Sequence, residues 1–320
     1  MKKRCSIVGM VVVLVLAFSS SAYPWGYATH AYIAHLLNKK AGQRNLNEIY
    51  GAMAPDLFNF RFDLPVMGEG GLYFWTHYRY DRVWDQAETG QSKGPGYGFV
   101  SHNDAWGADY TAHHSGRTYG QDGGYVIAKA IDLDEAELPP EILAYLPPGT
   151  TRLSDLVGPV VAWELQHTFV EYGLDLLTKR LDPVIGERIA ASAVCRSPEF
   201  PSLLVAAYAE EFAPLLDPAD AAEVIVGAEA EFNESMYGFG QVLMLDEADA
   251  REIISWQLSA FADEYLGGNL GLPQWLLAEI IDHYVAVAME ICEDDFPAEI
   301  HATIEYVDEE MALRKIGNQR

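Results

Sequence analysis

The chain has 320 residues, of which 50% are hydrophobic, so it can bury a large core as one large domain or two smaller ones. This composition excludes an intrinsically disordered protein. The 47 acidic and 21 basic side chains give a net charge of −26, which argues against a general nucleic-acid binder and favours the binding of cations.

The N-terminus has the three parts of a secretory signal peptide. Basic residues occupy Lys2–Arg4, an apolar run follows at Ile7–Phe18, and Ser20–Ala22 offers small residues for cleavage. The apolar run is short for a membrane span, although an uncleaved anchor is the alternative. We expect removal of residues 1–22 and a secreted or periplasmic protein. The remaining chain would carry 18 basic and 47 acidic side chains, a net charge of −29.

The next part of the chain predicts helices interrupted by loops. Apolar residues recur at helical spacing from His30 to Ile49. Glycine-rich segments predict loops at Gly90–Gly98 and Gly116–Gly124. We interpret Val126–Leu133 as a short strand.

The second half of the chain predicts a succession of long helices and an all-α fold. Pro159 suits the first turn of a helix that runs to about Arg180 and stops before Pro183. Two cysteines, Cys195 and Cys292, could form a disulfide or remain free thiols. We expect a first domain at 23–195 and a C-terminal helical extension at 196–320, which could belong to the same domain. Further helices are predicted at 203–216, 219–233, 247–266 and 273–292.

Seven of the nine histidines fall between His30 and His167, and most charged residues near them are carboxylates. Imidazole and carboxylate groups are the ligands of a divalent metal such as zinc. Three early positions are ambiguous when each is taken alone: Trp25 with His30 at the expected mature start, Asp56 after a proline, and His77 among aromatic residues. A buried aromatic residue, a turn or helix cap and a packed core histidine are the ordinary interpretations of these positions.

Two later segments give stronger signals. His102, Asp109 and His113 are spaced i, i+7 and i+11, so on one helix they would lie close to one face. His167 and Glu171 form an i, i+4 pair on the helix after Pro159, a spacing that lets two side chains grip one ion. A solvated polar face is the alternative in both segments. Together, the segments predict a metal centre.

The order of these motifs resembles the zinc-dependent phospholipase C family, whose relatives include zinc-dependent single-strand nucleases with the same all-helical fold. The resemblance covers roughly Trp25 to Leu177. The shared pattern is a Trp and a His at the mature start, a Pro-Asp, a His among aromatic residues, a His/Asp/His helix and a His-x-x-x-Glu helix. These positions are Trp25, His30, Asp56, His77, His102, Asp109, His113, His167 and Glu171.

The resemblance implies a site with up to three zinc ions. Asp109 would bridge two ions, and Asp56 would be a ligand or a base beside the attacking water. His113, His167 and Glu171 would hold another ion. The family's N-terminal Trp, here Trp25, binds metal through its amino group and carbonyl.

This chain departs from the family pattern at two places. Tyr23 and Pro24 would precede Trp25 after cleavage at residue 22, unless the cut falls before Trp25. His102 lies two turns before Asp109, whereas the family places that His one turn before its Asp. Either His102 still reaches the site from one turn further back, or Asp104 or Asp109 takes an altered role there, and His114 could replace His113.

The sequence therefore predicts an exported zinc-dependent hydrolase of phosphodiester bonds, most consistent with a phospholipase C that meets a membrane surface transiently and cleaves phospholipids. Bound zinc lowers the pKa of water and clamps phosphoryl oxygens, which is the chemistry that phosphodiester hydrolysis needs. The alternatives are a zinc-dependent nuclease or phosphatase, which the acidic charge disfavours for nucleic acid, and a non-catalytic protein with a structural metal site.

Overall fold

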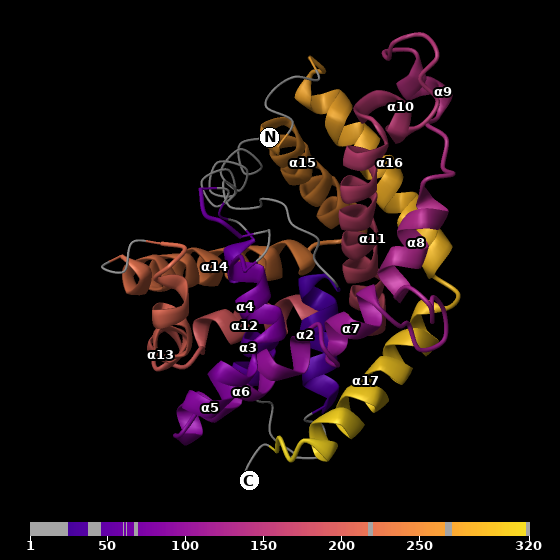
Figure 1. The fold of residues 1–320 in the computed structure, drawn as a ribbon. Helices are drawn as coiled ribbons and strands as arrows, with labels where there is room; N and C mark the ends of the chain where they lie inside the picture. The colour runs from indigo at the N-terminus through magenta and orange to yellow at the C-terminus, as the bar shows by residue number, and fades with distance from the viewer. Residues whose placement is uncertain are drawn as a thin grey trace.

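The computed structural model describes residues 25–37, 46–59, 61, 63–66, 70–216, 220–265 and 271–317, so the predicted signal peptide lies outside the described residues. Within these ranges the fold is all-α, with sixteen α-helices, one short 3-10 helix and no strand, which confirms the predicted fold class (Figure 1). The helices are α2 (Tyr27–Leu37), α3 (Leu46–Met53), η2 (Ala54–Phe58), α4 (Leu72–Tyr78), α5 (Asp81–Gln86), α6 (Gly90–His102), α7 (Ala108–His113), α8 (Tyr125–Leu133), α9 (Pro140–Leu143), α10 (Leu153–Val157), α11 (Pro159–Leu181), α12 (Ile185–Val194), α13 (Phe200–Phe212), α14 (Ala221–Leu243), α15 (Glu247–Tyr265), α16 (Gln274–Cys292) and α17 (Phe296–Leu313).

Helix α11 is the central element of the fold, as its predicted length suggested. Pro159 occupies its first turn, and the helix ends at Leu181, directly before Asp182. Every residue from Leu165 to Thr178 is buried, because α2, α8, α15 and α16 all pack around this helix (Figure 1). His167 and Glu171 therefore lie in the interior and not on the solvated face that was the alternative for them.

The segment from Gly90 to Gly98 is part of helix α6, so the predicted loop was wrong. Thr89 caps this helix by accepting hydrogen bonds from the backbone of Gln91 and Ser92. Gly98 lets α6 cross α3 at very short range, because a Cβ added there would lie 2.0 Å from a backbone oxygen of α3. Close helix approach explains this glycine, whereas Gly90 has open space around it.

The segment Val126–Leu133 lies within helix α8, so the predicted strand was also wrong. Val126, Ala130 and Leu133 recur at helical spacing and are all buried. An apolar run this short does not distinguish a strand from a buried helix. The preceding glycine-rich loop was predicted correctly, and the buried carboxylate of Glu299 holds it by accepting from the backbone nitrogens of residues 117–119 at 2.5–3.2 Å.

The helices after residue 195 share one buried cluster of hydrophobic side chains with the helices before it. Helix α16 packs on α11, and α17 runs past α2 and α7 (Figure 1). The predicted helices of this region are present, although α13 begins earlier than expected and α14 runs ten residues further. Cys195 is exposed, Cys292 is buried and both are free. Among the described helices, none combines the length and apolar character needed to cross a bilayer.

Candidate metal centre

The fold brings eight of the nine predicted ligand side chains together in the interior. They come from six elements, because α2, η2, α4, α6, α7 and α11 converge beside the middle of the central helix. Their nitrogen and carboxylate oxygen atoms form three groups in which all chosen atoms lie within 4.8 Å of one another. The groups are His30/His102/Asp109, Asp56/His77/His102 and His113/His167/Glu171.

His102 and Asp109 do not lie on one continuous helix, so this part of the prediction was wrong. Helix α6 ends at His102 and α7 begins at Ala108. Asn103 stabilises the intervening turn, since its Oδ1 accepts from the backbone nitrogens of residues 105–107 at 2.9–3.3 Å. Gly107 is required there, because an added Cβ would lie 2.5 Å from the carbonyl oxygen of His102. The turn folds the chain back and brings Asp109 to His102.

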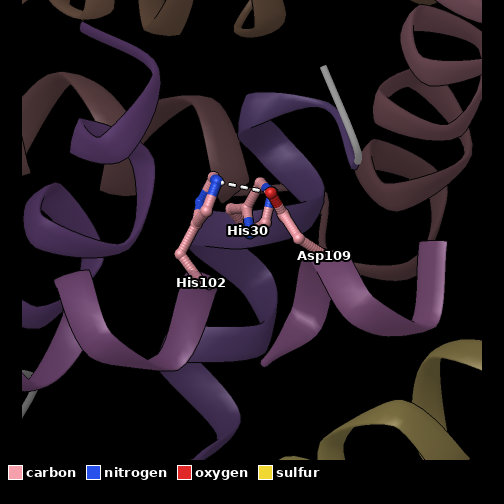
Figure 2. A group of neighbouring side chains, drawn as sticks. All are labelled: His30, His102 and Asp109. Carbon is pink, nitrogen blue, oxygen red and sulfur yellow. Dashed lines mark ion pairs between the residues drawn. The ribbon is translucent and has the colours of Figure 1, made fainter. Parts of the chain in front are cut away.

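The first group joins the start of the described chain to this turn. His30 Nε2 lies 3.1 Å from Asp109 Oδ1, and His102 Nε2 lies 2.9 Å from Asp109 Oδ2. The rings of His30 and His102 stack with centroids 3.9 Å apart. Figure 2 shows both imidazoles turned toward the single carboxylate. Each oxygen of Asp109 thus faces a different histidine.

The second group shares His102 with the first. His77 Nε2 lies 3.2 Å from His102 Nε2 and 3.2 Å from Asp56 Oδ1. Asp109 Oδ2 is 3.4 Å from His77 Nε2. Asn59 donates to Asp56 Oδ1 at 2.8 Å and fixes this carboxylate at the end of η2. Asp109 therefore contacts histidines of both groups.

The third group lies where α7 meets α11. His113 Nε2 is 3.2 Å from His167 Nε2, and His167 Nε2 is 3.4 Å from Glu171 Oε1 across one turn of α11. His167 and Glu171 are buried, whereas His113 is 10% exposed. This group is therefore nearer to solvent than the other two.

Hydrogen bonds at the far ring nitrogens determine which nitrogen faces the site. His102 Nδ1 lies 2.7 Å from the carbonyl of Ala52, and His77 Nδ1 lies 3.1 Å from that of Tyr73 and 2.8 Å from the hydroxyl of Thr76. A carbonyl only accepts, and Thr76 donates its own proton to the carbonyl of Leu72 at 3.3 Å, so each Nδ1 carries the proton and each neutral ring presents the Nε2 lone pair. Two lone pairs then face each other at 3.2 Å. A cation between them would relieve this repulsion.

Several buried polar atoms of the described residues lack a hydrogen-bond partner in this region. Buried polar atoms are normally satisfied, so a concentration of unsatisfied ones indicates a ligand site. These atoms face the three groups, and all can donate an electron pair. They are His30 Nε2, Asp56 Oδ2, both oxygens of Asp109 and both oxygens of Glu171.

Burial keeps four histidines of the centre neutral. It lowers the pKa of His30, His77 and His167 well below the usual value, and nearby histidines lower it further. The pKa of His102 is lowered by burial as well. A neutral imidazole is the form that binds a metal ion, so no proton needs to be displaced from these rings at neutral pH.

Burial has the opposite effect on the carboxyl groups. It raises the pKa of Asp56 to about 6 and raises that of Asp109 and Glu171 well above the usual range. For Asp109, the neighbouring carboxylates of Asp56 and Asp104 add to the rise. Three acidic groups confined together without counter-charges are unstable as anions, and a divalent cation would supply that charge.

Trp25 lies beside the centre as a buried core residue. Its indole Nε1 donates to the carbonyl of Ala108 at 2.8 Å and to Thr111 Oγ1 at 3.1 Å. Its ring stacks on Tyr125 with centroids 5.5 Å apart. The side chain thus anchors the chain against α7, next to Asp109. Metal binding by the main chain of Trp25 stays a prediction.

Sequence reasoning missed the role of Asp175, which the i, i+4 spacing after Glu171 could have indicated. Its Oδ1 accepts from the backbone nitrogen of Thr29 at 2.9 Å and from Thr29 Oγ1 at 3.1 Å, so it caps the first turn of α2. A Cβ at Gly26 would lie 2.4 Å from this carboxylate. Asp175 therefore ties the helix that carries His30 to α11.

No protein-family model, curated protein or solved structure matches the chain significantly. The description of the centre consequently rests on its geometry. That geometry consists of three buried groups of His, Asp and Glu side chains in an all-helical fold, each able to hold a metal ion.

Proposed function

We propose that the protein is an exported, zinc-dependent hydrolase of phosphodiester bonds that acts on phospholipids. The observation that carries the proposal is the approach of imidazole Nε2 atoms to carboxylate oxygens and to one another at 2.9–3.4 Å in the first two groups. Both oxygens of Asp109 and Oδ2 of Asp56 have no hydrogen-bond partner there. Two nitrogen ligands of one tetrahedral zinc ion lie about 3.3 Å apart, given a bond length of about 2.0–2.1 Å. The separations therefore fit the edges of zinc coordination tetrahedra.

Zinc fits the donor set of the centre as well as its dimensions. Imidazole nitrogens and carboxylate oxygens are typical zinc ligands, and the described centre uses no thiolate. Three dications held by the carboxylates of Asp56, Asp109 and Glu171 would leave a net positive charge in an acidic protein. Such a centre would attract a phosphate ester locally.

The chemistry assigned to the residues follows from their places. Bound zinc supplies a water of lowered pKa and contacts to phosphoryl oxygens. Asp56 would hold metal or accept the proton of the attacking water, and its pKa of about 6 in the metal-free protein is close to the working range of a general base. Asp109, facing histidines of two groups, would bridge two ions.

Three observations support a phospholipid in preference to a nucleic acid. A surface with a net charge of −26 repels a polyanion, whereas phosphatidylcholine carries no net charge. Helix α4, which carries His77, also exposes Phe74 and Tyr78, each 38% accessible, beside the centre. Aromatic side chains of this kind suit a transient contact with a membrane surface. The motif resemblance to the zinc-dependent phospholipase C family points the same way.

The test is metal analysis of the purified protein, followed by initial rates on short-chain phosphatidylcholine, phosphatidylinositol and single-stranded DNA at equal salt. We expect zinc to be bound and phospholipid to be cleaved faster than DNA. Faster DNA cleavage would instead assign a nuclease. Bound zinc without turnover of any substrate would assign a structural metal site, and a folded protein that binds no divalent metal would refute the proposal. Asp56→Asn should abolish turnover while the protein stays folded.

A further inference from the structure

Asp104 lies in the turn between α6 and α7 and belongs to none of the three metal-binding groups. It is 4% exposed, and its backbone nitrogen donates to the carbonyl of His77 at 3.1 Å. Three side chains lie against its carboxylate. Tyr78 donates its hydroxyl to Oδ2 at 2.5 Å, His114 Nε2 lies 3.0 Å from Oδ1, and His113 Nδ1 lies 3.5 Å from the same Oδ1.

The contact with His113 occurs at the ring nitrogen that faces away from the third group. His77 and His102 each place Nδ1 against a main-chain carbonyl, whereas His113 places it against a carboxylate. At 3.5 Å this contact is an ion-pair distance and not a hydrogen bond in this structure. A carboxylate behind Nδ1 nevertheless favours the proton on that nitrogen and leaves the Nε2 lone pair free for a metal ion. His113 Nε2 is the atom that lies 3.2 Å from His167 Nε2.

We propose that Asp104 is the positioning residue of the third group, which orients His113 and strengthens its Nε2 as a ligand of a divalent cation. The inference rests on the proposed function, since it assumes that His113, His167 and Glu171 hold an ion. A carboxylate behind a histidine ligand raises the basicity of the ring and fixes its orientation. Asp104 would thus act on the ion through His113, without touching it.

The geometry argues against two other roles for this part of the chain. Asp104 is not assigned as a direct ligand, because it belongs to none of the three groups, although its buried Oδ1 has no hydrogen-bond partner among the described residues. His114 does not replace His113. It is 44% exposed and lies against Asp104, while His113 faces α11. Tyr78 and His114 therefore serve to hold the carboxylate of Asp104 in its orientation.

The experiment tests two variants of Asp104, Asp104→Ala and Asp104→Asn. The controls are Tyr78→Phe and His114→Gln, which remove the other two partners of Asp104 and leave its carboxylate beside His113. Zinc affinity is measured by competition with a chelator. Nitrogen NMR of the metal-free protein with labelled histidines gives the tautomer of His113. The His113→Gln variant assigns the signals of His113, because they are missing from its spectrum. We expect Asp104→Ala to weaken one ion by about 10–100-fold, with the other two unchanged. His113 should also lose its proton from Nδ1.

The smaller effects separate positioning from a general structural role. Asp104→Asn, which keeps an acceptor oxygen but lacks the charge, should fall between wild type and Asp104→Ala. The Tyr78→Phe and His114→Gln proteins should stay within about threefold of wild type. Equal weakening of all three ions by Asp104→Ala would overturn the proposal, because it would indicate distortion of the whole turn.

Two further outcomes are decisive. A folded Asp104→Ala protein that keeps wild-type affinity for every ion and the Nδ1 proton on His113 would refute the role of Asp104. A wild-type protein that binds no zinc, but whose His113 tautomer depends on Asp104, would overturn the proposed function. It would still support the orientation of His113 by Asp104.

Discussion

Replacement of Asp109 by alanine tests the centre most directly. Asp109 Oδ1 lies 3.1 Å from His30 Nε2, while Oδ2 lies 2.9 Å from His102 Nε2 and 3.4 Å from His77 Nε2. In the proposed centre, a carboxylate in this position would serve two ions. We therefore expect Asp109→Ala to lose more than one zinc equivalent, whereas His167→Ala, which removes a neutral ligand of the third group, should lose about one.

The size of the effect follows from the charges involved. Two divalent ions about 4 Å apart repel each other by about 17 kcal/mol at an effective dielectric constant of about 20. A full negative charge about 2 Å from one of these ions would attract it by about the same amount under the same assumptions. The bridge therefore offsets the repulsion, and its removal leaves the repulsion uncompensated. Loss of one neutral imidazole changes no charge.

Replacement of Asp109 should weaken zinc binding but stabilise the metal-free protein. Both oxygens of Asp109 are buried without a hydrogen-bond partner, and burial raises the pKa of this carboxyl. Asp109→Asn removes the charge and offers a donor to His102 Nε2. We expect the metal-free variant to gain about 1–3 kcal/mol, a rise of about 2–4 °C in melting temperature for each kcal/mol. The rise produced by added zinc should shrink at the same time.

The assay is zinc stoichiometry after identical dialysis, with circular dichroism to verify folding and thermal melts with and without zinc. Asp182→Ala is the matched control, since Asp182 is a buried carboxylate that pairs with Arg188 at 2.8 Å, away from the three groups. It should destabilise the protein and retain all zinc. If folded Asp109→Ala keeps the wild-type zinc count, the bridge assignment is wrong.

Three other outcomes are expected. Burial raises the pKa of Asp56 from 3.8 to about 6, so the free energy of unfolding of the metal-free wild type should fall by about 3 kcal/mol relative to Asp56→Asn as the pH rises from about 4 to 7. Denaturant unfolding measures this difference, and equal pH dependence of the two proteins would contradict it. Gly26→Ala should destabilise by about 1–3 kcal/mol because its Cβ would lie 2.4 Å from Asp175, whereas Gly227→Ala, with open space around it in α14, should be neutral or stabilising. Intact mass of the secreted protein should show a chain cleaved near Ala22, and a mass that still includes residues 1–22 would exclude this cleavage.

Much of the centre was predictable from local spacing. His167 and Glu171 lie one turn apart on a helix whose start at Pro159 and end before Asp182 are coded locally, so their side chains share a face in any fold that keeps the helix. The all-α class was likewise predictable, because helical periodicity is a property of short windows. The clustering of histidines beside carboxylates indicated the chemistry before the geometry was known.

The local errors have a common physical cause. The same short sequence can be compatible with two local structures, and tertiary contacts then determine which one forms. The glycines of 90–98 look like a loop, but the segment is helical and Gly98 allows α6 to approach the backbone of α3. Val126–Leu133 looks like a strand, but its buried face matches a helix packed on α11 and α16. Burial against particular neighbours decided both cases, and no local window contains those neighbours.

The export prediction for residues 1–22 depends on composition and length alone, and it stays a prediction. The convergence of the candidate ligands, in contrast, depends on the tertiary structure. The chain breaks after His102, turns on Asn103 and Gly107, and returns with Asp109 facing His102 at 2.9 Å. Spacing along one ideal helix does not produce this contact. Only the packing of α2, η2, α4, α6, α7 and α11 places the donors of three groups together, because long-range burial fixes the direction of each side chain.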